Sequence, residues 1–194
     1  EVLGEAQSGE IQEIGFNLYT SMLNAAVRAL KEGKEPDLTQ PLGVTSEINL
    51  HAPALLPDNY CSDVHERLTL YKRLANCDGE EELLLLQEEL IDRFGELPDQ
   101  ARTLLETHRL RILAKPIGLA KIDATEAVIK LQFIPNPPID PARIIQLVQQ
   151  DRRWKLAGPD RLVVARETTT LPERATAIRE IISLLNHPVT QKKS

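Results

Sequence analysis

The sequence is poor in cysteine. It has two cysteines in 194 residues, Cys61 and Cys77, and they form neither a CxxC pair nor a Cys/His cluster. This usage excludes a disulfide scaffold and a cysteine-based zinc site, and it indicates a reducing compartment. The sequence also has no run of 18 apolar residues, and its acidic start lacks the basic and then apolar order of a signal peptide. We therefore expect a soluble, cytoplasmic protein.

Catalytic signatures are also missing. The sequence has no GxxxxGK[ST] phosphate-binding loop and no HExxH motif. The best remaining enzymatic candidate is Asp63, His65 and Glu66, where a carboxylate and an imidazole lie close in sequence. Asp63 and Glu66 also have the spacing of a helix capping box, which explains the same residues without chemistry. We expect no catalysis, and a hydrolase built on these residues would lose its turnover when His65 is replaced by alanine.

The charges are divided unevenly along the chain. Residues 1–100 carry 20 acidic and 7 basic side chains, whereas residues 101–194 carry 9 acidic and 16 basic ones. A formal net charge of -6 makes the whole chain a poor binder of DNA phosphates. The basic half keeps open an alternative in which it contacts DNA through Arg152, Arg153, Lys155, Arg161 and Arg166.

The hydrophobic pattern predicts an α+β fold, with a helical first half and a small mixed β-sheet with packed helices in the second half. Residues 12–33 are apolar around more than half of a helix, which indicates packing against two bodies. A linker at 34–45 and a short strand around Ile48 follow. Three helices are expected in residues 63–115, with starts at Asp63/Glu66, at Asp78/Glu81 and near Pro98, and Pro116 ends the third.

The second half alternates strands and helices. We expect strands at 117–122 and 127–134 and two short ones around Trp154 and Leu162. One helix should run from Asp140–Pro141 to about Asp151. A last helix, capped by Thr170 and Glu173, turns four apolar residues inward: Ala175, Ile178, Ile182 and Leu185.

The segment 79–94 has an unusual helical wheel. Its predicted inward arc contains Leu83, Leu84, Leu86, Leu90, Ile91 and Phe94. Leu85 falls on the opposite face, which otherwise carries Glu81, Glu82, Glu88, Glu89 and Asp92, with Arg93 at its border. A charged helix face is usually only a solvated one, and a single exposed leucine is common. A leucine ringed by acids is also how a small interaction hot spot with a charged rim looks.

Four segments carry a family resemblance. LGEAQSG at 3–9 resembles the end of the translocation motif that transcription-repair coupling factors share with RecG-type helicases. LLPDNY at 55–60, RLTLYKRLA at 67–75 and ELIDRFGELP at 89–98 resemble, in order and spacing, the C-terminal domain of the coupling-factor family. The resemblance is specific over about residues 1–115 and weak after that.

The resemblance implies a regulatory domain of an ATP-dependent DNA translocase that removes stalled RNA polymerase and recruits the excision-repair protein UvrA. In this family the C-terminal domain folds back on the N-terminal UvrA-binding domain and restrains the motor. Glu89, Asp92 and Arg93 belong to the family's ELIDRFG segment and lie on the same outward face as Leu85, so we expect these four residues to bind a partner. The implied remnant of the translocation motif is Gly4, Gln7, Ser8 and Gly9.

The resemblance also implies the domain limits. Residues 1–45 would hold the end of the translocation motif, a hinge helix and a linker, residues 46–190 the regulatory domain, and 191–194 a disordered tail. The ATPase motifs of such a motor are absent from the sequence, so ATP and Mg²⁺ would belong to the parent motor, which binds RNA polymerase, UvrA and duplex DNA. The alternative is a DNA-contacting accessory module of a RecG-like helicase.

Overall fold

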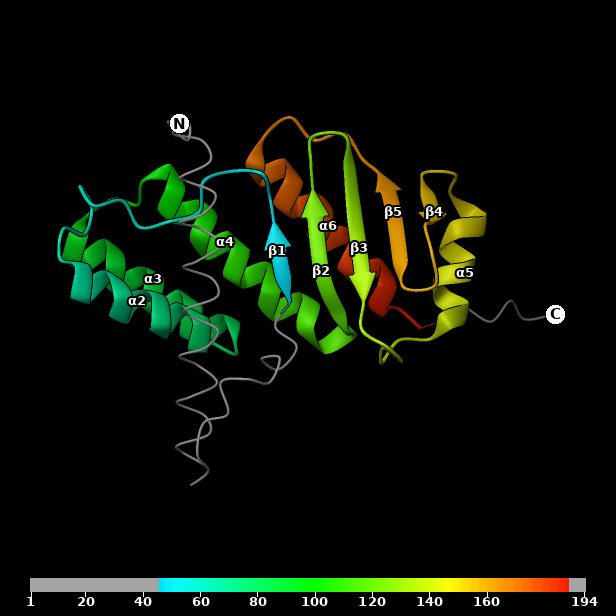
Figure 1. The fold of residues 1–194 in the computed structure, drawn as a ribbon, viewed down its shortest axis with the longest axis horizontal. Coiled ribbons are helices and arrows are strands. Elements are labelled where there is room, and N and C mark those ends of the chain that lie inside the picture. The colour runs from blue at the N-terminus through cyan, green and yellow to red at the C-terminus, as the bar shows by residue number, and fades with distance from the viewer. Residues whose placement is uncertain (1–45, 189–194) are drawn as a thin grey trace, which may run out of the picture.

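The computed structural model describes residues 46–188, which contain five α-helices and one five-stranded sheet (Figure 1). The strands are β1 (Glu47–Asn49), β2 (Leu119–Ala124), β3 (Val128–Phe133), β4 (Trp154–Leu156) and β5 (Arg161–Ala165). The helices are α2 (Val64–Asn76), α3 (Glu80–Phe94), α4 (Asp99–Ala114), α5 (Pro141–Gln150) and α6 (Leu171–Asn186). The predicted α+β fold is confirmed. The predicted hinge helix at 12–33, the motif residues Gly4, Gln7, Ser8 and Gly9, and the tail at 191–194 lie outside the described residues.

The sheet is mixed, as predicted, and its strand order is β1-β2-β3-β5-β4. β1 runs parallel to β2, and the other neighbours are antiparallel. Parallel neighbours cannot be joined by a tight turn, so the chain between β1 and β2 must make a crossover. Here the crossover contains α2, α3 and α4, which form a helical region beside β1, while α6 lies behind the sheet (Figure 1).

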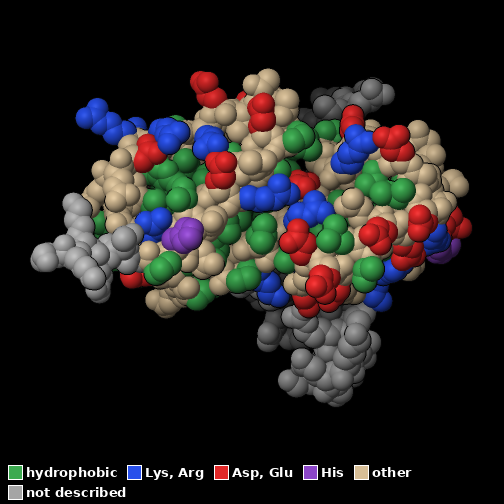
Figure 2. Space-filling view, turned by 180° about the vertical axis from the view of Figure 1, so that it is seen from behind, with side chains coloured by type: hydrophobic (Ala, Val, Ile, Leu, Met, Phe, Trp, Pro, Cys, Tyr) green, Lys and Arg blue, Asp and Glu red, His purple; other side chains and the backbone are tan. Residues whose placement is uncertain are grey.

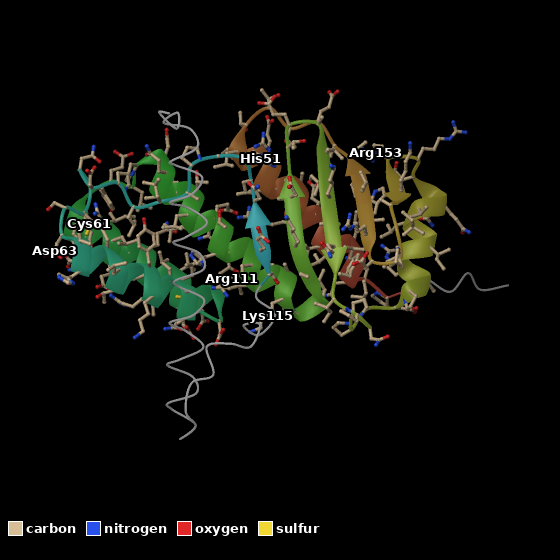
Figure 3. The ribbon with its side chains drawn as sticks, in the orientation of Figure 1. His51, Cys61, Asp63, Arg111, Lys115 and Arg153 are labelled. Atoms are coloured by element: carbon tan, nitrogen blue, oxygen red, sulfur yellow. The ribbon has the colours of Figure 1, made fainter. Side chains whose placement is uncertain are left out.

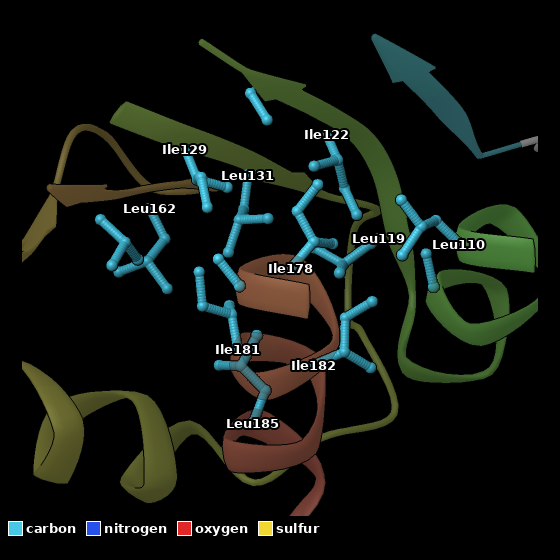
Figure 4. Close-up of a cluster of buried hydrophobic side chains, with 14 of the residues drawn as sticks. Leu110, Leu119, Ile122, Ile129, Leu131, Leu162, Ile178, Ile181, Ile182 and Leu185 are labelled. Atoms are coloured by element: carbon cyan, nitrogen blue, oxygen red, sulfur yellow. The ribbon is translucent and has the colours of Figure 1, made fainter. Parts of the chain in front are cut away.

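Two separate hydrophobic cores hold the described residues together. The sheet core lies between the strands and α6 and includes Ile129, Leu131 and Ile178 (Figure 4). The helical core joins α2, α3 and α4 through side chains such as Leu74 and Leu90. α4 belongs to both cores: Ala101, Leu104 and Leu105 are buried in the helical one, and Leu110 and Ala114 in the sheet one. This helix therefore fixes the helical region to the sheet.

The helix boundaries follow local chemistry at most predicted places. The Asp63 side chain accepts a hydrogen bond from the Glu66 N–H at 3.0 Å and caps α2. Thr170 and Glu173 form the predicted capping box of α6. Gly95 ends α3 with φ 89°, and its N–H donates to the Ile91 carbonyl at 2.9 Å. Only glycine adopts this backbone region at little cost.

The capping box predicted at Asp78 and Glu81 is wrong. α3 begins at Glu80 after an extended Gly79, and no side chain caps it. Instead the Asp78 N–H donates to the Glu82 carboxylate at 3.4 Å. Three acids in the first turn, Glu80, Glu81 and Glu82, face the positive end of the helix dipole and stabilise this start without a cap.

Three arginines hold backbone carbonyls across the fold. Arg174 donates to the Leu50 carbonyl at 2.6 Å and so fixes the chain just after β1. Arg143 donates to the Leu184 carbonyl at 2.7 Å in the last turn of α6. Arg111 donates to the Leu74 and Cys77 carbonyls at 3.3 and 2.9 Å at the end of α2. The last two place a cation at the negative end of a helix dipole.

Candidate protein-interaction site

α3 packs in the helical region through a narrow stripe. Leu83, Leu86 and Leu90 are buried, and Phe94 is half-buried against the Tyr60 ring at 5.5 Å. The prediction that Leu84 and Ile91 also turn inward is wrong, because their side chains are 44% and 42% exposed. Within residues 46–188 α3 packs against α2, α4 and the loop that carries Tyr60, and these elements bury a smaller arc than the predicted wheel assumed.

The exposed side of α3 is therefore more apolar than predicted. Leu85 is 67% exposed, the highest value among the large apolar side chains of residues 46–188, which confirms its outward position. We call the exposed arc the α3 outer face, and it consists of Glu81, Leu84, Leu85, Glu88, Ile91 and Asp92. Figure 2 shows acidic and apolar side chains gathered over the helical end of the molecule, at the right of that view. On this helix Glu81, Glu88 and Asp92 lie between Leu85 on one side and Leu84 and Ile91 on the other, so the face mixes acidic and apolar side chains.

Glu89 and Arg93 lie at the edge of this face and take part in an ion-pair network with α2. Both Arg73 terminal nitrogens donate to the Glu89 carboxylate, at 2.8 and 2.5 Å. Arg93 donates to the same carboxylate at 3.1 Å and also pairs with Glu66. The hydrogen bond from Arg73 holds the pKa of Glu89 below its ordinary value, and the same bond raises the pKa of Arg73.

The four predicted partner-binding residues thus fall into two pairs. Leu85 and Asp92 are exposed, and the Asp92 side chain has no hydrogen bond or ion pair within residues 46–188. Glu89 and Arg93 are close to them on the helix but are engaged with α2. The exposure of Leu84 and Ile91 was not predicted. Both residues are within four positions of Glu88 on the same side of the helix, and this spacing was a signal that they could face outward. The role of Arg73 was also not predicted, because nothing in sequence links it to a carboxylate on another helix.

Two members of the Asp63, His65 and Glu66 group have structural roles in this fold. Asp63 caps α2, and Glu66 pairs with Arg93. In the part of the chain that the structure describes, no group of three His, Cys, Asp or Glu side chains can hold a metal ion. No helix among the same residues is long and apolar enough to cross a membrane.

His108 lies on α4 at the join between the two cores. Its Nδ1 accepts a hydrogen bond from the Arg111 Nε at 3.3 Å. Burial of the ring, and second the charge of Arg111, lowers the pKa of His108 to about 3. The ring is therefore neutral at physiological pH and serves as an acceptor within the fold.

The cations of the DNA-contacting alternative are only partly free. Arg153 pairs with Asp151 at 2.7 Å, and Arg166 pairs with Glu180 at 2.7 Å. Lys155 and Arg161 are exposed on β4 and β5 without a partner in the described chain. Figure 3 places Arg153 at the end of the molecule opposite Asp63, so Arg153 lies far from the acidic helical end. Salt-dependent binding of duplex DNA remains the test of this alternative.

These observations define an α+β domain in which a helical region, inserted as a crossover, presents one open acidic and apolar helix face. Residues 50–144 match the family model of the TRCF domain. The chain is 44% identical over 179 residues to a transcription-repair-coupling factor of Escherichia coli (strain K12) and 46% identical over 151 residues to one of Haemophilus influenzae. These alignments cover 92% and 78% of the chain. The chain belongs to the transcription-repair coupling factor family.

The likeness extends to a solved structure but to only a small part of the whole relatives. The fold matches the crystal structure of a C-terminal domain of transcription-repair coupling factor with a TM-score of 0.58 and 24% identity. That match covers 73% of this chain and 94% of the solved one, so it supports the fold. The chain spans 15% and 13% of the length of the two relatives.

Proposed function

We propose that this chain is a non-catalytic regulatory domain of a cytoplasmic, ATP-dependent DNA translocase. The parent motor, which uses ATP and Mg²⁺, would remove stalled RNA polymerase from duplex DNA and recruit UvrA for nucleotide excision repair. The α3 outer face would dock on the N-terminal UvrA-binding domain of the same protein, mask its UvrA surface and restrain the motor.

One observation carries this proposal: three large apolar side chains, Leu84, Leu85 and Ile91, stay exposed together on one helix. Single exposed apolar residues need no explanation, but neighbouring ones on a rigid helix suit burial by a partner. Burying one leucine contributes roughly 1.5–3 kcal/mol. Glu81, Glu88 and Asp92, which lie between these apolar side chains, would favour a basic partner surface and disfavour an acidic one.

The proposal predicts that Leu85 matters for docking and that an equally exposed apolar residue elsewhere does not. Ile145 on α5 is 51% exposed and lies in the sheet region, so Ile145→Ser is a matched control for Leu85→Ser. We expect Leu85→Ser to weaken binding of this chain to the UvrA-binding domain about tenfold, which corresponds to about 1.4 kcal/mol. Equal affinities for the two variants in a calorimetric titration would contradict the proposal.

The full-length parent protein tests the regulatory part. Reversing Glu89 and Asp92 to lysine places repulsive charges opposite a basic partner. We expect this variant to raise both the basal ATPase rate and the capture of UvrA in a pull-down. If both stay at the repressed level while the melting temperature of the domain is kept, the docking face lies elsewhere.

A further inference from the structure

The two acids proposed to dock are not equally available. Glu89 accepts two hydrogen bonds from Arg73 and one from Arg93. A carboxylate offers about four lone-pair sites, so at most one remains for a partner. A guanidinium of the partner therefore cannot make a bidentate contact with Glu89 while Arg73 stays in place. Asp92 has no partner within residues 46–188 and is ready for contact.

The Arg73–Glu89 pair is exposed enough to exchange. The Arg73 side chain is 46% exposed and the Glu89 side chain 33%. Exposed ion pairs contribute little to folding, because water competes with both charges. Arg73 also reaches Glu89 from another helix, α2, so it can swing away without unwinding α3. Exchanging Arg73 for an arginine of the partner at Glu89 therefore changes the binding free energy little.

We infer that Arg73 is an internal competitor that weakens docking by occupying Glu89, and that docking exchanges Arg73 for a cationic group of the partner. This inference rests on the proposed function and concerns Glu89 at the edge of the α3 outer face. Under it Asp92 and Leu85 make the first contact, and Glu89 joins only after the exchange. Arg73 then lowers the affinity of docking. A low affinity suits an inhibitory contact that has to dissociate when the motor is activated.

The test is a comparison of dissociation constants for this chain and the isolated UvrA-binding domain of the parent protein. Arg73→Gln frees the Glu89 carboxylate, and we expect it to tighten binding about fivefold. Lys72 is next to Arg73 and makes no hydrogen bond or ion pair within the described chain, so Lys72→Gln removes the same charge without freeing an acid. We expect Lys72→Gln to tighten binding less than twofold.

Two further variants keep the result unambiguous. Arg73→Lys keeps the charge but loses the planar fork, so it should also tighten binding, by less than Arg73→Gln. In the double variant Arg73→Gln with Glu89→Gln the gain should vanish. Melting curves of all variants check that the domain stays folded.

Weaker binding by Arg73→Gln, or equal tightening by Arg73→Gln and Lys72→Gln, would overturn the inference. In either case a loss of binding in Leu85→Ser would leave the proposed function standing. Binding by neither the natural chain nor Arg73→Gln would contradict the proposed function and the inference together.

Discussion

The helical region and the sheet region differ in how they use apolar side chains. In the sheet region the core under the strands is closed by α6, and the exposed large apolar residues, Ile145, Leu156 and Leu184, lie on three different elements. In the helical region α3 exposes three such residues, Leu84, Leu85 and Ile91, and Leu55, Val64 and Leu68 are also exposed on the loop before α2 and on α2. The comparison indicates that the sheet region provides stability, whereas the helical region keeps an exposed apolar surface that a partner can cover.

Because α4 has residues in both cores, the α3 outer face rests on a rigid support. An ion-pair chain reinforces the join, since Glu106 of α4 pairs with Arg179 of α6 and with Arg109, which reaches Glu80 of α3 at 3.6 Å. A surface held this way loses little conformational entropy when a partner binds. We therefore expect the two regions to unfold as one unit, although only the helical region carries the docking surface.

The largest effect is expected at α4. Leu110 is fully buried in the sheet core, and Leu110→Ala should cost about 3 kcal/mol through lost burial and a cavity. For a domain of this size that corresponds to a fall in melting temperature of about 10 °C. Helical circular dichroism follows both regions, and the fluorescence of Trp154, the one tryptophan, follows the sheet core. Coincident shifts support one unit, and a shift in only one signal would separate the regions.

A smaller effect is expected from pH at His108. Its folded pKa of about 3 lies below the ordinary 6.5, so the unfolded chain binds a proton that the folded chain refuses. The free energy of unfolding should be highest above pH 6.5. As the pH falls below 6.5, it should decrease by up to about 1.4 kcal/mol per pH unit. Denaturant titrations between pH 7.5 and pH 5 avoid most carboxylate titration. His108→Gln keeps an acceptor for Arg111, and it should flatten the slope. An unchanged slope would show that another group titrates.

The smallest effect on stability is expected on the α3 outer face. Asp92 has no partner within the described residues and Leu85 is mostly exposed, so Asp92→Lys and Leu85→Ser should each change the free energy of unfolding by less than about 0.5 kcal/mol. Glu89→Lys should cost somewhat more, because it breaks the contacts with Arg73 and Arg93. Losses above about 2 kcal/mol at Leu85 would mean that the face is structural.

Local signals allowed much of the fold to be predicted from the sequence. The Thr170 and Glu173 capping box, the Asp140–Pro141 helix start and the Gly95 stop depend on nearest neighbours, and each is confirmed. The prediction failed where tertiary packing decides. The width of the buried arc of α3 depends on which elements pack against it. Leu84 and Ile91 were therefore predicted to face inward but are exposed.

The candidate site could likewise be predicted only in part from the sequence. The outward position of Leu85 followed from periodicity alone and is confirmed. The pairing of Glu89 with Arg73 joins residues on different helices, and it follows from the antiparallel packing of α2 and α3 rather than from any spacing along the chain. The parallel pairing of β1 with β2 across the whole helical region is a long-range feature of the same kind.

Docking through the helical region is tested most directly by a methyl-resolved NMR titration of this chain with the UvrA-binding domain. We expect the methyl signals of Leu84, Leu85 and Ile91 to shift or broaden. Those of Ile145 and Leu156, which are 51% and 58% exposed in the sheet region, should not change. Changes at Ile145 and Leu156 with unchanged signals on α3 would contradict the claim that the helical region carries the docking surface.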